Sequence, residues 1–324
     1  MRAPGFAIAV CSIALFASFA ANAQELTPEE LLRRMSISLR RVDFEGSFVY
    51  QHDGRTDALR IFHDGGEQER ERLVSLTGAR GEIIRDGHSV TCLQSNTAPT
   101  LFANRAEMRL LPLVPNVREL GAQYSVNLGG VDRVAGYDAR IVDILPRDPY
   151  RYGYRLWLQQ GNQLLLRSAV MDQARRPLEQ FMFVALDIGE KPRETDLSPV
   201  GNVGNAASPV DEVPITTKPF WNVADAPAGF HLVRTQRPLG SASHSEHLVY
   251  TDGIASVSVY VEPQAQPAPI VAESTIVHGV VSIHTLDSGG VHVTALGDVP
   301  PATVQAMARS VRANGTDGVV PVER

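Results

Sequence analysis

The spacing of apolar residues changes along the chain, and the first clear pattern is helical. Leucine, methionine and valine recur every three or four residues from Leu31 to Val42, which is typical of a helix with one apolar face. Thr27 and Glu30 match the two positions of a capping box, and Pro28 occupies the first helical position. The pattern predicts an amphipathic helix that packs on another element.

From residue 44 the period becomes two, which predicts β-strands. Phe44, Gly46, Phe48 and Tyr50 fall on one side of the first strand, with polar residues opposite. Turn sequences rich in glycine and aspartate separate the apolar segments. We expect about nine strands joined by short turns, near residues 44–51, 59–62, 69–76, 80–85, 124–128, 139–145, 152–159, 164–170 and 180–187.

A second region follows a change in composition. Residues 189–214 are dense in Gly, Pro, Asn, Ser and Asp and lack hydrophobic periodicity, which indicates an exposed linker. Beyond the linker, the pattern predicts strands at 230–234, 246–250, 255–262, 274–286 and 291–296, and a final helix at 300–312.

The first 23 residues carry Arg2, an apolar run from Phe6 to Ala21, and a small-x-small sequence ending at Ala23. This order is typical of a secretory signal peptide, so we expect residues 1–23 to be removed on export. Cys92 would then be the single remaining cysteine, and a lone thiol cannot form a disulfide within the chain. We interpret it as a buried strand residue.

Length and charge narrow the class of protein. A chain of 324 residues suggests two domains. Thirty basic against 36 acidic side chains give a net charge of −6, which argues against nucleic acid as a partner because phosphate binding requires a basic surface.

The sequence offers no recognised catalytic motif. It contains no G-x-S-x-G, H-E-x-x-H, phosphate-binding or dinucleotide-binding sequence. His244 and His247 are three residues apart, a spacing that places them on opposite faces of a strand and not around one metal ion. We therefore predict no catalytic site, no metal site and no cofactor, and we favour a binding protein over an enzyme.

The segment Tyr150–Leu158 is the densest aromatic feature. On a strand, its tyrosines and leucines share one face, while Arg151, Arg155 and Trp157 share the other. Two interpretations remain open: a simple core, or a curved sheet that lines a cavity for an acyl chain or an apolar peptide. Strand alternation selects these cavity or core-face candidates: Phe48, Tyr50, Ile61, Tyr154, Leu156, Phe181 and Phe183.

Six segments together resemble the MucB/RseB family of periplasmic negative regulators of envelope-stress sigma factors. They are FEGSFVY at 44–50, VAGYDAR at 134–140, YGYRLWL at 152–158, LEQFMF at 178–183, HLVYTDGIASVSV at 247–259 and GDVPPAT at 297–303. The resemblance covers essentially the whole chain after the signal peptide, in the same order.

The resemblance implies an α+β protein of two domains. The large domain, at residues 24–190, is expected to be a half-open antiparallel β-barrel with plugging helices, similar to the lipoprotein carriers LolA and LolB. A linker at 191–212 and a smaller C-terminal α/β domain at 213–318 would follow.

The resemblance also implies a function. Such proteins bind the periplasmic region of a membrane anti-sigma factor (MucA/RseA-like) and shield it from site-one proteolysis, and lipid or lipopolysaccharide signals release them. We therefore expect a periplasmic location, an anti-sigma factor as partner and a lipid or lipopolysaccharide ligand; a homo-oligomer is compatible with this role. The alternatives are a periplasmic lipid or lipoprotein carrier and, less favoured, an exported hydrolase. The sequence identifies no residue of the partner interface.

Overall fold

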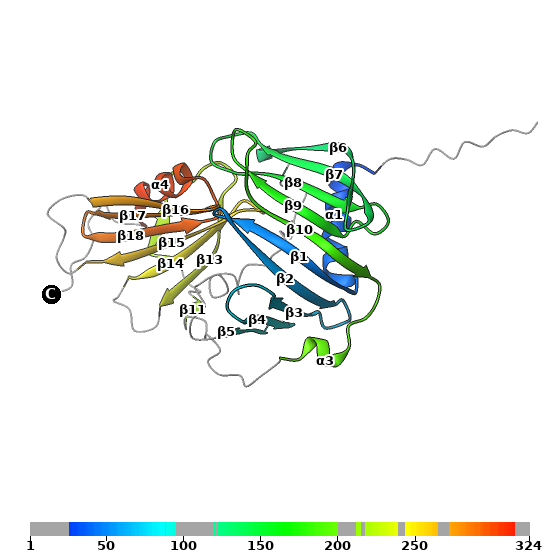
Figure 1. Cartoon of the computed structure of the whole chain (residues 1–324). Helices are drawn as coiled ribbons and strands as arrows, with labels where there is room; N and C mark the ends of the chain where they lie inside the picture. Colours follow the sequence, from blue (N-terminus) through cyan, green and yellow to red (C-terminus); the bar gives the residue numbers. More distant parts are fainter. Residues whose placement is uncertain are drawn as a thin grey trace, which may run out of the picture.

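A large and a small β-sheet, a two-stranded ladder and few helices make up the described part of the chain (Figure 1). The computed structural model describes residues 26–87, 89–94, 120, 122–199, 212–214, 218–238, 244–264 and 272–314. Among these residues, no helix combines the length and apolar character needed to cross a membrane. The predicted signal peptide, residues 1–23, lies outside the described residues.

Helix α1 (Pro28–Arg41) begins as the capping pattern predicts, although the box is only half formed. The Thr27 hydroxyl accepts the Glu30 backbone N–H at 3.2 Å. The Glu30 carboxylate turns away from the cap and accepts from Arg33 Nε at 2.7 Å and Arg34 Nε at 2.8 Å. These guanidinium groups, Arg33 first, lower the pKa of Glu30 to about 2. The ion pairs with arginines one turn further along the helix therefore replace the predicted hydrogen bond from the Thr27 backbone N–H to the Glu30 side chain.

The large sheet has ten antiparallel strands in the order β5-β4-β3-β2-β1-β10-β9-β8-β7-β6. Each strand pairs with its neighbour in sequence, except that β1 pairs with β10 and joins the two halves. The strands are β1 (Phe44–His52), β2 (Arg55–Asp64), β3 (Arg70–Ser75), β4 (Gly81–Asp86), β5 (Ser89–Gln94), β6 (Tyr124–Val134), β7 (Tyr137–Pro146), β8 (Gly153–Gln159), β9 (Leu165–Met171) and β10 (Pro177–Ile188).

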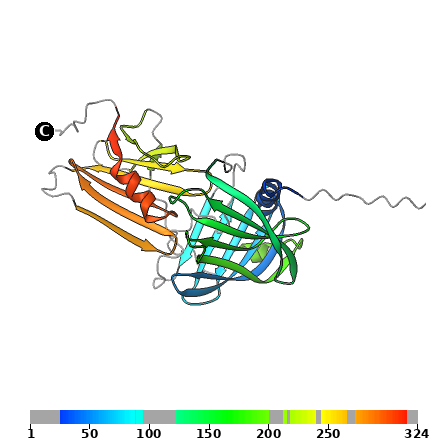
Figure 2. The ribbon, with the colours of Figure 1, turned by 90° about the horizontal axis from the view of Figure 1, so that it is seen from above.

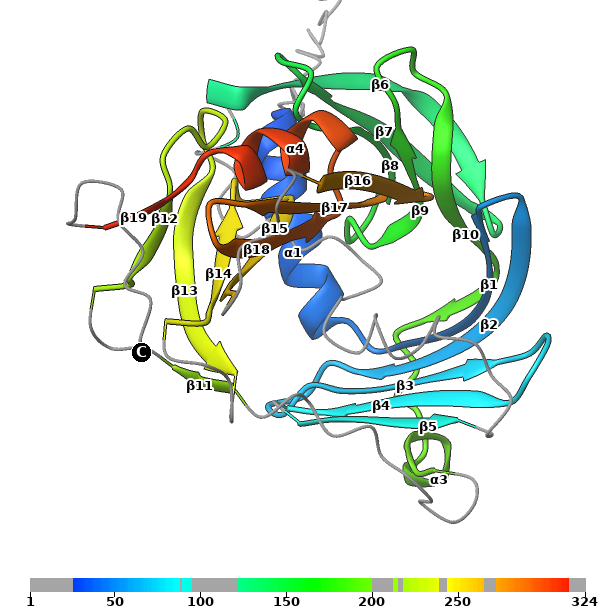
Figure 3. The ribbon, with the colours of Figure 1, turned by 90° about the vertical axis from the view of Figure 1, so that its left-hand side faces the viewer.

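The sheet curves around α1 (Figure 3), so the helix covers its inner face. Leu31, Leu32, Met35 and Leu39 of the helix are buried in one cluster with the inward side chains of the strands. In β1, every second residue from Phe44 to Tyr50 is buried, which confirms the predicted face. The apolar stripe of α1 and the alternating strand faces thus form one core.

The small sheet has seven antiparallel strands in the order β11-β13-β14-β15-β18-β17-β16, with α4 (Pro301–Arg309) packed on one side (Figure 2). All its ladders are antiparallel, so this unit is α+β in type and not the α/β domain that the resemblance implied. Its strands are β11 (Glu212–Pro214), β13 (His231–Pro238), β14 (Glu246–Thr251), β15 (Ser256–Pro263), β16 (Ala272–His278), β17 (Val281–Ser288) and β18 (Val291–Gly297).

Two expectations for this region were wrong. The segment 274–286 is not one strand but the hairpin of β16 and β17, because Gly279 adopts a positive φ of 57° and reverses the chain. The final helix does not reach residue 312. It ends at Arg309, and β19 (Val311–Ala313) pairs with β12 (Trp221–Val223) instead. Pairing with a strand distant in sequence is therefore more favourable for Val311 than continuation of the helix that its spacing predicted.

The first part of the expected linker contacts the large sheet. Helix α3 (Glu194–Leu197) lies against β3: Arg70 Nη1 is 2.9 Å from Glu194 Oε1, and Arg72 Nη1 donates to the Asp196 carbonyl at 3.0 Å. Residues 200–211, the remainder of the segment up to β11, lie outside the described residues.

The packing of α1 predicts that Leu32→Ala lowers the free energy of unfolding by about 2–5 kcal/mol, because the fully buried side chain leaves a cavity. Ile37→Ala is the matched control on the same helix, since Ile37 is 42% exposed, and should cost about 0.5 kcal/mol or less. Urea unfolding would be followed by Trp157 fluorescence in a Trp221→Phe background. Equal losses in the two variants would contradict the proposed core.

Candidate functional site

The seven cavity or core-face candidates lie together on the inner face of the large sheet. They come from four strands, β1, β2, β8 and β10, and belong to one buried cluster beneath α1. None is more than 6% exposed. All seven are thus part of the buried core of the large sheet, and their part in a ligand cavity remains a prediction.

Three of these candidates form an aromatic cluster across β1 and β10. The Phe48 ring centroid lies 5.9 Å from that of Phe181 and 5.6 Å from that of Phe183, with steep interplanar angles. Such edge-to-face contacts stabilise the folded state beyond what the burial of apolar area alone contributes. Because these rings are buried, an acyl chain could reach them only if α1 or the rings moved.

A carboxylate lies at one end of this apolar face. Glu179 of β10 is buried, and its Oε2 accepts the Tyr50 hydroxyl at 2.5 Å. The alternation that selects Phe181 and Phe183 also places Glu179 on the same face, two residues earlier. The two-residue period of β10 therefore indicates the position of Glu179, although a charged residue is not expected on an otherwise apolar face.

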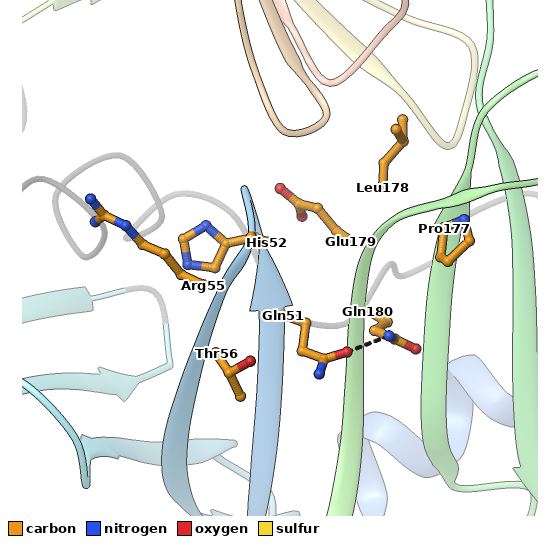
Figure 4. Close-up of a pocket in the computed structure, with 9 residues that line it drawn as sticks. Gln51, His52, Arg55, Thr56, Pro177, Leu178, Glu179 and Gln180 are labelled. Carbon is orange, nitrogen blue, oxygen red and sulfur yellow. Dashed lines mark hydrogen bonds between the residues drawn. The ribbon is translucent and has the colours of Figure 1, made fainter.

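A polar cavity of about 240 Å³ lies beside Glu179 at the ends of β1, β2 and β10 (Figure 4). It is lined by Gln51, His52, Gly54, Arg55, Thr56, Pro177, Leu178, Glu179 and Gln180. None of the seven candidates lines it. Gly279 of the small sheet lies close to the Glu179 carboxylate, because a Cβ added there would sit 2.7 Å from Oε1. The cavity is therefore near the place where the two sheets meet.

A buried ion pair joins the sheets near the start of β8. Arg151 and Asp252 both have fully buried side chains, and Arg151 Nε donates to Asp252 Oδ2 at 2.5 Å. The Tyr124 hydroxyl donates to the same oxygen at 2.9 Å. Arg151 was expected to share one face of a strand with Arg155 and Trp157. This was wrong because β8 begins only at Gly153, so the alternation does not extend to Arg151.

The other two members of that pattern behave as predicted. Arg155 forms a two-point ion pair with Asp143 on β7, with N···O distances of 2.7 and 3.0 Å. Trp157 Nε1 donates to Asp132, and the Arg167 guanidinium lies 4.2 Å from a Trp157 ring centroid. By strand alternation both groups lie on the face of β8 opposite Tyr154 and Leu156, although Trp157 is itself buried.

A third carboxylate lies near the junction. Asp298 follows β18, and its Oδ1 accepts the Ser256 backbone N–H at 3.1 Å. Removal from water, together with the charges of Asp252 and Glu179, raises the pKa of Asp298 from its ordinary value of 3.8 to about 6. The junction thus brings carboxylates of both sheets close to one another.

The histidine pair has local partners in the structure. The His244 ring lies 4.2 Å from that of Phe220, and His247 Nε2 is 2.9 Å from the Ser258 hydroxyl and stacks on Tyr260. The described residues contain no group of three or more His, Cys, Asp or Glu side chains placed to hold a metal ion. Cys92 lies in β5 as expected, but its side chain is outside the described part.

Two family models match the chain over most of its length. The MucB/RseB N-terminal domain matches residues 27–201, and the MucB/RseB C-terminal domain matches residues 216–312. The chain belongs to the MucB/RseB family. The family resemblance is therefore confirmed.

Relatives of known role extend over nearly the whole chain. The sigma factor AlgU regulatory protein MucB of Pseudomonas aeruginosa is 31% identical over 298 residues, covering 89% of this chain and 92% of that protein. The sigma-E factor regulatory protein RseB of Haemophilus influenzae is 27% identical and covers 93% of this chain and 96% of its own length.

Solved structures of the family share the arrangement of both sheets. A crystal structure of MucB in complex with MucA(peri) superposes with a TM-score of 0.72 at 28% identity, covering 90% of this chain and 100% of that one. A crystal structure of MucB alone gives a TM-score of 0.62 at 28% identity, covering 89% and 98%.

The environment of Asp298 predicts a pH effect on stability. The folded chain, with a pKa of about 6, holds a proton that the unfolded chain releases near 3.8. Stability from this group is therefore lost as the pH rises from about 4 to about 6. Asp298→Asn should flatten this part of the curve of melting temperature against pH and raise the melting temperature at pH 7. Parallel curves for the two proteins would contradict the assignment.

Proposed function

We propose that this chain is a periplasmic regulator that binds the periplasmic region of a membrane anti-sigma factor and shields it from site-one proteolysis. The observation that carries the proposal is the match to MucB in complex with MucA(peri), which includes both sheets. The relatives' names, which describe sigma factor regulators, support the same role. A regulator of this kind acts by binding and needs no catalytic group.

We propose the inner face of the large sheet as the ligand site. Its buried aromatic and aliphatic side chains suit an acyl chain of a lipid or a lipopolysaccharide. A ligand releases the partner only if it binds the partner-free form more tightly than the complex. Entry of an acyl chain beneath α1 would favour a form in which that helix has moved, and this form need not bind the partner equally well.

The proposal includes the finer organisation of the chain. The open, curved ten-stranded sheet with α1 against it is consistent with a half-open barrel plugged by a helix. We place the signal peptide at residues 1–23, the large domain at 24–190, the linker at 191–212 and the small domain at 213–318. Export by the signal peptide would deliver the chain to the periplasm.

The apolar inner face also supports a second function, that of a lipid or lipoprotein carrier. Such a carrier needs only the large sheet, whereas this chain retains a second sheet joined to the first by a buried ion pair. That joint favours the regulator. Transfer of labelled lipoprotein between membranes by the purified chain would instead favour the carrier.

The regulatory function predicts protection of the anti-sigma factor. The chain without residues 1–23 should bind the periplasmic region of the anti-sigma factor from the same organism in calorimetry. Cleavage of that factor by the site-one protease should slow in proportion to the fraction bound, and lipopolysaccharide fragments should restore it. A folded chain that neither binds nor protects a folded partner would refute the proposal.

The ligand site predicts where a lipid contacts the chain. A phospholipid with a photoreactive diazirine in its acyl chain should label inward residues of β1, β8 and β10, such as Phe181 and Phe183, because they face the proposed site. Val184 is the matched control, since it lies on β10 but is 54% exposed. Peptide mass spectrometry would locate the labels. Labelling of Val184 alone would contradict the proposed site.

A further inference from the structure

Arg151 and Asp252 form a charged joint between the two sheets. Arg151 precedes β8 of the large sheet, and Asp252 follows β14 of the small sheet, 101 residues later. Both side chains are fully buried. Arg151 belongs to the aromatic segment that was predicted to be a strand. It is not among the candidates for the apolar ligand site.

Further hydrogen bonds from both sides hold the two charged groups of the joint. Arg151 also donates Nη1 to Asp148 and Nη2 to the Ala228 carbonyl. Asp252 Oδ1 accepts the backbone N–H groups of Ile254 at 3.0 Å and Ala255 at 2.8 Å. The Asp252 carboxylate is thus held rigidly by its own turn, in position to receive the guanidinium group.

Aromatic rings from both units enclose the guanidinium group. The Phe230 ring of the small unit lies 4.8 Å from Arg151 Cζ, and the Tyr124 ring of the large sheet lies 5.8 Å from it. Gly229 allows this close approach: it has a φ of 93°, and a Cβ there would lie 2.6 Å from Gln123 Cγ. A second contact lies nearby, where the Thr303 hydroxyl donates to the Tyr150 carbonyl at 2.7 Å.

A buried ion pair of this kind contributes little to the affinity of one sheet for the other. Its main effect is to favour one relative orientation of the two sheets. Removing two charges from water costs about as much as their attraction returns, so the docked state gains little net free energy. A small rotation or slide that kept the interface dry would break the pair: Asp252 would lose its opposite charge, and Arg151 would keep only the Asp148 carboxylate of its own sheet. Breaking a buried ion pair in this way is strongly destabilising. The sheets are therefore held in one orientation or fully separated, and intermediate arrangements are disfavoured.

We propose that Arg151 and Asp252 are positioning residues that hold the two sheets in the orientation required for binding of the anti-sigma factor. The second half of this statement rests on the proposed function. Tyr154 and Leu156, both candidates for the ligand site, lie on β8, which begins two residues after Arg151. A displacement of β8 by a ligand on the inner face would therefore act directly on the joint.

The test measures orientation and partner binding separately. Fluorophores on cysteines at Val184 of β10 and Ile276 of β16, both 54% exposed, would report the distance between the sheets by single-molecule energy transfer. Cys92→Ser would be present in every sample. The first variant is Asp252→Asn, which keeps the shape of the side chain but removes its negative charge. The second is Arg151→Lys, which keeps the positive charge but cannot reach all three acceptors of the guanidinium group, namely Asp252, Asp148 and the Ala228 carbonyl.

The matched controls are Asp143→Asn and Arg155→Lys, which alter an ion pair within the large sheet alone. Circular dichroism and the melting temperature would verify that each variant is folded. Should Asp252→Asn fail to fold, Arg151→Lys retains both charges and still tests the joint.

We expect one narrow distance distribution for the unmodified chain and both controls, and a broadened or shifted distribution for Asp252→Asn and Arg151→Lys. Affinity for the periplasmic region of the anti-sigma factor should fall about tenfold in these two variants. An unchanged distribution in both variants would overturn the positioning role. A changed distribution with unchanged affinity would overturn the link to the partner. Absence of binding by the unmodified chain would refute the proposed function, and the distance measurement would still decide the positioning role.

Discussion

The pairing of β1 with β10 is the interaction on which the large sheet depends. It places Phe44 opposite Ile188 and His52 opposite Glu179, and so joins strands from the beginning and the end of this region. Strands β2 to β5 extend from one side of this pair and β9 to β6 from the other. Without it, the inner face would be divided, and the apolar stripe of α1 would lose part of the surface that buries it.

The same ladder connects the apolar face to the junction between the sheets. Phe48, Phe181 and Phe183 lie along it beneath α1, while Tyr50 and Glu179 lie at the end near the small sheet. A ligand among the rings and a partner that spans both sheets would thus involve the same strands. This shared structure provides a physical route for one binding event to change the free energy of the other.

Helix α1, the start of α4, the alternating strand faces and the division into two sheet-forming regions followed from the sequence alone. Local rules suffice there: the three-to-four spacing from Leu31 to Leu39 determines which side of α1 is apolar, and the period of two places Phe48 and Tyr50 on one face. The family resemblance extended this to the order of the domains and the class of partner, because quoted segments from both regions carried it.

Features that depend on partners distant in sequence were decided only by the tertiary structure. The β16–β17 turn at Gly279 and the pairing of β19 with β12 both replaced a locally reasonable strand or helix with a more favourable arrangement. The burial of Arg151 was likewise beyond the sequence pattern, since an arginine next to a strand is normally exposed. It is buried here because Asp252, from the other sheet, supplies the opposite charge, and a partner 101 residues away leaves no periodic signal.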